Sequence, residues 1–144
     1  MKLSWIDTHA HLYEDVFNED KNEMLQRAMD SGVEQMIIQN VDITTIDGML
    51  QLEKDFPFQC LPTMGLHPCS VKENYQEELL HVEAELARRK FYAVGEIGID
   101  LFWDKTFLKE QQHAFQHQIQ YDANIKTTNH QKPTSYCSSR NQTD

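Results

Sequence analysis

Two histidines stand one residue apart near the start of the chain, in the stretch IDTHAHLY at residues 6–13. In an extended strand alternate side chains share a face, so Asp7, His9 and His11 are expected to point the same way. Neighbours on one face are roughly 6 to 7 Å apart along a strand, which allows two imidazoles to reach one metal ion. The alternative interpretation is a pair of histidines on a hydrated surface, since such short pairs often arise by chance.

Residues of the same chemical kind follow two later apolar stretches. His67 ends FQCLPTMGLHP, and Glu96 and Asp100 lie in the last part of FYAVGEIGID. The carboxyl ends of parallel strands converge to form the binding sites of α/β proteins, so these residues are expected to meet the histidine pair. A carboxylate that faces two imidazoles makes a mixed nitrogen and oxygen site for one or two divalent ions. Such a site lowers the pKa of bound water and stabilises negative charge on a phosphodiester.

Simpler structural interpretations remain open for these residues. Glu96 is equally well explained as a buried acid neutralised by a nearby base, because buried acids need a partner. His67 is either a pocket residue or an ordinary loop residue. His113 and His117 have the i, i+4 spacing of zinc-binding helices, but the glutamate of that motif is missing and exposed helix histidines are commoner. We therefore assign no metal role to this second pair.

Four strand-then-helix units position the residues that carry the chemistry. Apolar runs predict strands at 2–7, 33–41, 58–68 and 91–100, and helical patterns predict helices at 18–32, 44–56, 75–90 and 105–120. Gly32 stands where a C-terminal helix cap is expected, and Leu79 and Val82 belong to the apolar stripe of the third helix. This order implies parallel strands with crossover helices, and four units make half of an eight-unit barrel. The fold class is therefore α/β, the N-terminal half of a TIM-like barrel.

The pattern stops near residue 120. Residues 121–144 have no apolar period and are dominated by Asn, Thr, Ser, Gln and Lys. Such a segment cannot bury enough apolar surface to offset its ordering entropy, so we expect a disordered or loosely attached tail. The chain thus divides into a partial barrel domain at 1–120 and a polar tail at 121–144, for which a frameshift or a premature gene end is the working hypothesis.

Size, charge and cysteines limit the possible functions. A chain of 144 residues with 40% hydrophobic and 25% charged residues is typical of one soluble domain. It contains no membrane-length apolar run and no signal-peptide core, and it implies no stable protein partner. Its three cysteines form no C-x-x-C pair, which suits free thiols in the cytoplasm. With a net charge of −10, a nucleic-acid substrate requires a bound cation to offset the repulsion.

The motifs IDTHAHL, MGLHP and VGEIGIDLFW occur in this order along the chain. Together they resemble the TatD family of metal-dependent deoxyribonucleases within the amidohydrolase superfamily, over residues 3–120. The resemblance implies a metal-dependent hydrolase in a TIM-like barrel that cleaves phosphodiester bonds in DNA. By the same resemblance His9 and His11 match metal ligands, and Glu96 matches a carboxylate that is both ligand and catalytic residue.

His67 matches a histidine near the family's pocket and Asp100 a recurrent acid, so both are expected to contact substrate. The family's later motifs, which supply further histidines, an arginine and a final aspartate, have no counterpart here, and His130 is not assigned to them. We therefore expect one or two divalent ions (Mg, Mn or Zn), DNA as substrate, and impaired or absent cleavage by this truncated chain. The alternatives are a hydrolase of small esters or amides, which a carboxylated lysine in place of Glu96 would favour, and a non-catalytic fragment.

Overall fold

The computed structural model of the protein describes residues 4–128, in which strands and helices alternate. One parallel sheet has the order β1-β2-β3, formed by β1 (Trp5–Ala10), β2 (Val33–Ile38) and β3 (Cys60–Pro62). The α-helices are α1 (Lys21–Asp30), α2 (Ile46–Asp55), α3 (Tyr75–Arg88) and α4 (Leu108–Thr128). Short 3-10 helices are η1 (Asp15–Phe17), η2 (Ile43–Thr45) and η3 (Pro68–Ser70). The predicted α/β class with parallel strands is confirmed.

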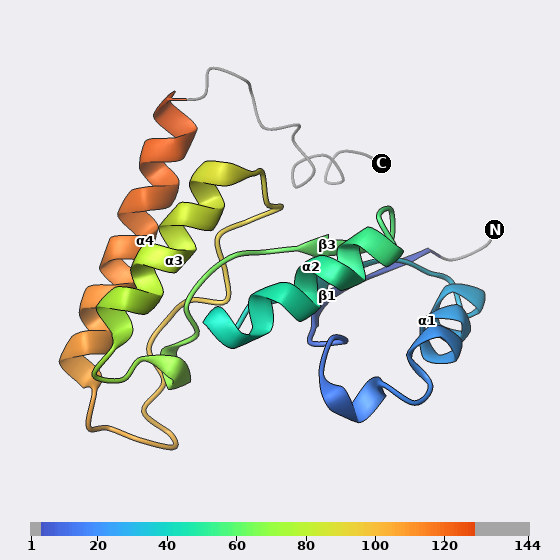
Figure 1. The fold of residues 1–144 in the computed structure, drawn as a ribbon, viewed down its shortest axis with the longest axis horizontal. Coiled ribbons are helices and arrows are strands. Elements are labelled where there is room, and N and C mark those ends of the chain that lie inside the picture. Colours follow the sequence, from blue (N-terminus) through green and yellow to red (C-terminus); the bar gives the residue numbers. More distant parts are fainter. Residues whose placement is uncertain (1–3, 129–144) are drawn as a thin grey trace, which may run out of the picture.

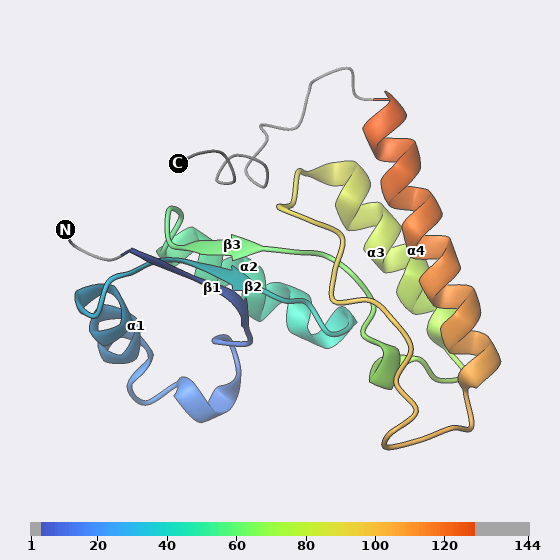
Figure 2. The ribbon, with the colours of Figure 1, turned by 180° about the vertical axis from the view of Figure 1, so that it is seen from behind.

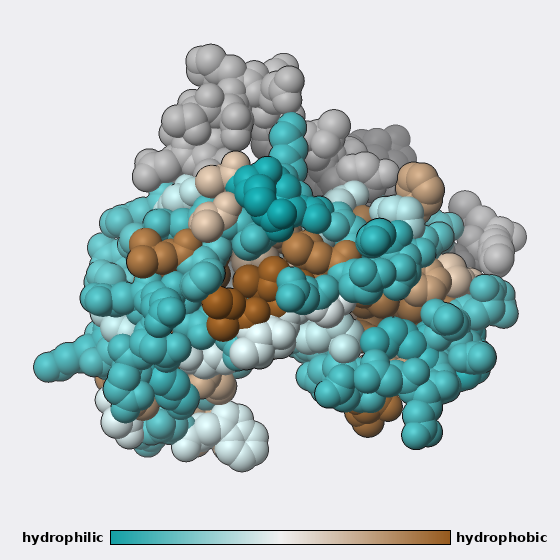
Figure 3. Space-filling model, viewed as in Figure 1, coloured by the Kyte–Doolittle hydropathy of each residue, from teal (hydrophilic) through white to brown (hydrophobic). Residues whose placement is uncertain are grey.

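Helices cover one face of the sheet and leave the other open. Figure 1 shows α2 lying over the sheet, with α3 and α4 side by side. In Figure 2 the opposite face of the sheet is turned to the viewer, and no helix of residues 4–128 covers it. Helices outside and strands inside are the arrangement of a barrel wall. On the face seen in Figure 3 the surface is largely hydrophilic, with hydrophobic residues exposed in the middle over α2.

The hydrophobic core lies between the sheet and the inner sides of the helices. Ile38 of β2 and Met49 of α2 are completely buried, and Leu25 of α1 is 1% exposed. Leu79 and Val82 of α3 join the same cluster, so the apolar stripe predicted for the third helix is confirmed. Burial of one stripe of each helix stabilises the elements that carry the strand-end residues.

The end of α1 has the predicted glycine cap. Gly32 has a φ of 98°, which lies in the left-handed region that glycine adopts without strain. Its N–H donates to the carbonyl oxygen of Met29 at 3.0 Å, and its own carbonyl accepts the N–H of Trp5 at 2.9 Å. The turn therefore closes the helix and sets the start of β2 beside β1.

The strand predicted at 91–100 is wrong as a regular strand. The segment does lie beside β3, where one isolated parallel bridge joins Met64 to Val94. Bends at Glu96 and Gly98 follow that bridge, so Glu96 and Asp100 do not share a strand face. The physical reason is that Gly95 weakens the strand, and no strand within residues 4–128 pairs with the segment's other side.

Gly65 lets this segment come close to the end of β3. A Cβ atom at Gly65 would lie 2.8 Å from Cγ2 of Ile97 and 3.0 Å from the carbonyl carbon of Gly95. Any other residue here would push the two backbones apart. The glycine therefore fixes how closely the loop that carries Glu96 approaches the sheet.

The last helix continues past the predicted domain end at residue 120. α4 runs to Thr128, and its buried residues include Gln111, Ala114 and Gln118. The disorder predicted for the rest of the tail, 129–144, lies outside the described residues. Among the helices of residues 4–128, none has the length and apolar character needed to cross a membrane.

Candidate metal centre

His9 and His11 stand at the carboxyl end of β1, and the tips of their imidazoles converge. Nε2 of His9 lies 3.1 Å from Nε2 of His11. The pairing of β1 with β2 is irregular between Asp7 and Ala10, and His11 stands just beyond the strand. The carboxylate of Asp7 accepts the backbone N–H of His9 at 3.0 Å. Asp7, which was expected beside the imidazoles, therefore binds the backbone of β1 where its pairing with β2 becomes irregular.

Glu96 brings a carboxylate to the two imidazoles from the loop beside β3. Its Oε2 atom lies 3.3 Å from Nε2 of His9 and 3.6 Å from Nε2 of His11. The ligand atoms of these three residues all lie within 4.8 Å of one another, and no other such group occurs within residues 4–128. The structure thus gathers the three residues that the sequence predicts as metal ligands.

The chemistry of this group fits a divalent cation. Oε2 of Glu96 is buried and accepts no hydrogen bond within the described part of the chain. A buried polar atom without a hydrogen bond destabilises a protein, so this oxygen, with two imidazole nitrogens beside it, is suited to a cation as its partner. One such oxygen beside two imidazole nitrogens is a donor set typical of zinc and related ions.

His67 lies on the other side of Glu96, with its Nε2 atom 3.3 Å from Oε1 of the carboxylate. Its Nδ1 atom accepts the backbone N–H of Cys69 at 3.0 Å. A ring nitrogen that accepts a hydrogen bond carries no proton, so the proton of the neutral ring is on Nε2. His67 therefore offers Glu96 a hydrogen-bond donor, whereas a metal ligand would need a lone pair at that atom.

Asp100 lies outside the group formed by His9, His11 and Glu96. Its Oδ1 atom accepts the backbone N–H of Phe102 at 2.8 Å. This bond, assisted by a hydrogen bond with the Cys69 side chain, holds the pKa of the Asp100 carboxyl below its usual value. Asp100 therefore lies beside Cys69, which follows His67 by two residues.

Two buried glutamines of α4 hold the loops that carry these residues. Gln118 accepts the N–H of Leu66 at 2.7 Å and donates to the carbonyl of the same residue at 3.3 Å. Gln111 accepts the N–H of Asp100 at 2.9 Å and donates to its carbonyl at 3.0 Å. Sequence reasoning missed both residues. Their signal is a pair of polar residues at i, i+7 on the face of the helix that turns to the core.

Polar side chains at the ends of β2 and β3 connect the two sides of the site. Gln39 donates to the carbonyl of Thr8 at 3.3 Å and accepts the hydroxyl of Thr63 at 2.6 Å. The same hydroxyl lies 2.9 Å from the carbonyl oxygen of Gly95, which precedes Glu96. These residues also escaped the sequence analysis, although polar residues that end an apolar strand are a recognisable signal.

Tyr13 is a buried neighbour of His11 that the sequence analysis did not single out. Its hydroxyl lies 2.9 Å from Nδ1 of His11, the ring nitrogen remote from Glu96. Burial raises the pKa of Tyr13 to about 12. The sequence does contain a pattern that predicts this contact: His9, His11 and Tyr13 are spaced by two residues, so their side chains are expected on the same side of an extended chain.

Sequence comparison assigns the chain a family and several relatives. The TatD related DNase family matches residues 6–127. The chain is 31% identical over 113 residues to the uncharacterized metal-dependent hydrolase YabD of Bacillus subtilis (strain 168), covering 78% of this chain and 44% of that protein. It is 28% identical over 120 residues to the 3'-5' ssDNA/RNA exonuclease TatD of Edwardsiella piscicida, covering 83% of this chain and 46% of that protein. The chain therefore spans about half the length of the curated relatives it matches.

Solved structures give the same result for the fold. The crystal structure of YjjV, a TatD homolog from Escherichia coli K12, matches with a TM-score of 0.78 and 30% identity, covering 88% of this chain and 49% of that one. A TatD family hydrolase from Entamoeba histolytica has the same fold, with a TM-score of 0.67 and 24% identity over 88% of this chain and 48% of that one. These matches confirm the predicted half-barrel. The chain belongs to the TatD related DNase family.

Proposed function

We propose that His9, His11 and Glu96 bind one divalent cation, and that this site serves a TatD-type phosphodiester hydrolase. The observation that carries the proposal is the buried Oε2 atom of Glu96, which has no hydrogen-bond partner among the described residues and lies 3.3 Å from Nε2 of His9. A bound cation lowers the pKa of water and stabilises negative charge on a phosphoryl group. Two imidazoles and one carboxylate suit Zn²⁺ or Mn²⁺ better than Mg²⁺, which prefers oxygen ligands.

The side chains around this cation have different proposed roles. His9 and His11 supply neutral nitrogen ligands, and the charge of Glu96 offsets that of the cation. His67 faces Glu96 with an N–H group, which suits it to orient this carboxylate beside the cation. Asp100 stays ionised and holds the loop through the amide of Phe102.

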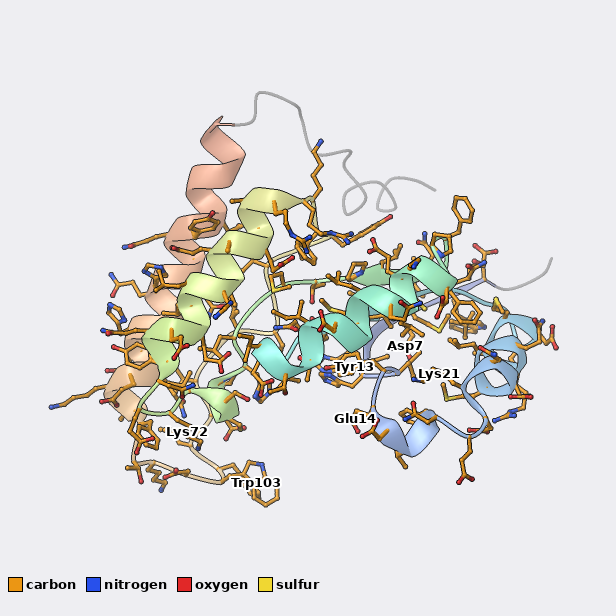
Figure 4. All side chains as sticks on the ribbon, viewed as in Figure 1. Asp7, Tyr13, Glu14, Lys21, Lys72 and Trp103 are labelled. Atoms are coloured by element: carbon orange, nitrogen blue, oxygen red, sulfur yellow. The ribbon has the colours of Figure 1, made fainter. Side chains whose placement is uncertain are left out.

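The proposed substrate is DNA in single-stranded form. Phe102 and Trp103 follow Asp100 directly, and their side chains are 81% and 78% exposed. Their rings touch edge to face with centroids 4.7 Å apart, and Trp103 stands at the outer tip of its loop (Figure 4). Exposed aromatic rings stack on unpaired bases, for about 1–3 kcal/mol per base. Stacking supplies affinity that a chain with a net charge of −10 does not obtain from phosphates.

We expect the 144-residue chain alone to cleave DNA slowly or not at all. A two-metal clamp on the attacking and leaving oxygens needs more ligands than the three gathered within residues 4–128. Three protein ligands suffice for one ion with an open coordination position. Binding of metal and substrate should therefore be easier to detect than turnover.

The experiment measures binding of a fluorescent single-stranded oligonucleotide by anisotropy, with Mn²⁺ or with EDTA, and follows cleavage on gels. We expect binding that requires the metal and is lost in Glu96→Gln, and any cleavage should show the same dependence. The matched control is Glu77→Gln, which changes an exposed glutamate of α3. Equal binding in EDTA, or full binding by Glu96→Gln, would contradict the proposal.

A cytoplasmic location is also proposed, on the basis of the thiols. Cys60 is buried and Cys69 partly buried, and both are free. Burial raises the pKa of the Cys60 thiol to about 12, which keeps it protonated and unreactive. Free thiols are typical of reducing compartments.

A further inference from the structure

Tyr13 is held firmly behind His11 by packing. The residue is 9% exposed, and its ring meets that of His11 edge to face, with centroids 5.8 Å apart and planes at 84°. A Cβ atom on Gly48 of α2 would lie 3.4 Å from Cβ of Tyr13, so the helix backbone passes close to the side chain. Figure 4 shows Tyr13 beside α2. The position of its hydroxyl is therefore set by the fold.

The hydrogen bonds of this hydroxyl have only one consistent direction. Tyr13 donates to the backbone carbonyl oxygen of Gln39 at 2.8 Å, and a carbonyl oxygen can only accept. A protonated tyrosine has a single O–H, so its oxygen is left to accept from Nδ1 of His11 at 2.9 Å. The proton of the neutral His11 ring is therefore on Nδ1.

We propose that Tyr13 is a positioning residue that holds His11 in the Nδ1–H tautomer and so presents the lone pair of Nε2 to the metal ion. This inference rests on the proposed metal site. His67, on the other side of Glu96, is held in the opposite tautomer by the amide of Cys69. The Nε2 atom of His11 thus offers a lone pair, whereas the Nε2 atom of His67 carries a proton. A ligand histidine that donates from its far nitrogen is also fixed in orientation and made more basic.

A purely structural role for Tyr13 makes a different prediction. Tyr13→Phe keeps the ring, its packing on Gly48 and its contact with His11, and removes only the hydroxyl. If Tyr13 only fills space, the tautomer of His11 and the affinity for metal should not respond to this change. If Tyr13 positions His11, both should respond.

The first test records the tautomers of the metal-free protein by two-bond ¹H–¹⁵N correlation spectra of labelled histidines. The spectra are taken at about pH 8.5, roughly two units above the usual histidine pKa. We expect Nδ1–H for His11 and Nε2–H for His67 in the wild type. In Tyr13→Phe the signal of His11 should move toward the Nε2–H form while His67 stays unchanged. Tyr92→Phe, which alters a tyrosine that is 62% exposed, should change neither.

The second test titrates Zn²⁺ into the same proteins by calorimetry. Tyr13→Phe should bind about 10- to 100-fold more weakly, as for other partners of ligand histidines, and Tyr92→Phe should bind like the wild type. An Nε2–H tautomer of His11 in the wild type overturns the inference, and this result needs no variant to fold. An unchanged tautomer or affinity in folded Tyr13→Phe also overturns it. A wild type with the expected tautomer that binds no metal instead overturns the proposed metal site.

Discussion

At the scale of single residues, Glu96 has an unsatisfied buried oxygen in the proposed metal site. Its buried Oε2 atom has no hydrogen-bond partner among the described residues, although two imidazole nitrogens lie within 3.6 Å. A carboxylate cannot donate to a nitrogen lone pair, whereas the amide of glutamine can. Functional sites commonly carry such a conflict between activity and stability.

Glu96→Gln should therefore stabilise the metal-free protein and abolish its stabilisation by metal. We expect the free energy of unfolding in EDTA to rise by about 1–3 kcal/mol, because an unsatisfied buried group is removed. Added Zn²⁺ should raise the stability of the wild type but not that of the variant. Urea unfolding with and without metal measures both effects. A loss of stability in EDTA would show that Glu96 is already satisfied without metal.

The residue types at the site could be predicted better than their arrangement. The pair His9 and His11 and the carboxylate of Glu96 follow from the convergence of strand ends. The hydrogen bond from the amide of His9 to Asp7 does not follow, because it depends on the irregular pairing of β1 with β2. The role of Tyr13 could not be predicted for a related reason. It depends on the contacts of the hydroxyl with His11 and with the backbone of Gln39, which only the folded structure shows.

At the scale of elements, α3 shows how a periodic pattern decides which residues carry stability. Leu79 and Leu80 are neighbours in the sequence, but Leu79 is 4% exposed and Leu80 is 65% exposed. The stripe that contains Leu79 packs into the core, and Leu80 points to solvent. The helical period of the sequence is enough to predict this difference.

Leu79→Ala should lower the free energy of unfolding by about 2–5 kcal/mol, because it leaves a cavity in a packed core. Leu80→Ala, the same change one residue later, should stay within about 0.5 kcal/mol of the wild type. Urea unfolding followed by circular dichroism gives both values. Similar losses in the two variants would contradict the assigned helix orientation.

Two of the differences between the sequence prediction and the structure have a clear physical reason. The segment at 91–100 pairs with β3 through one bridge, since Gly95 favours bends and a partner is present on one side only. α4 extends to Thr128 because each added residue needs only a backbone hydrogen bond, and an apolar stripe is not required for that. Hydrophobic periodicity predicts which face of an element is buried. It predicts neither the loss of regular strand pairing at 91–100 nor the end of α4.

At the scale of the whole molecule, the described sheet has an open edge. β1 is an outer strand of the order β1-β2-β3, and its residues Trp5 and Ile6 are 55% and 49% exposed. Exposed apolar edge strands pair with other chains unless a charge or a covering element prevents it. We therefore expect the 144-residue protein to self-associate as its concentration rises.

Ile6→Lys should reduce this self-association, because a lysine on an edge strand opposes pairing with a second edge. Val16→Lys is the matched control, since Val16 is 74% exposed on η1 and lies outside the sheet. Light scattering over a concentration series measures the effect. An equal reduction by both variants would point to net charge instead of the edge.

The most direct test of the central claim is a Zn²⁺ titration of the wild type, His9→Ala, Glu96→Gln and His81→Ala by calorimetry. His81 is an exposed histidine of α3 and controls for loss of an imidazole as such. We predict about one ion per chain for the wild type and His81→Ala, and no measurable binding at this site for His9→Ala and Glu96→Gln. Binding of one ion with wild-type affinity by both His9→Ala and Glu96→Gln would contradict the account.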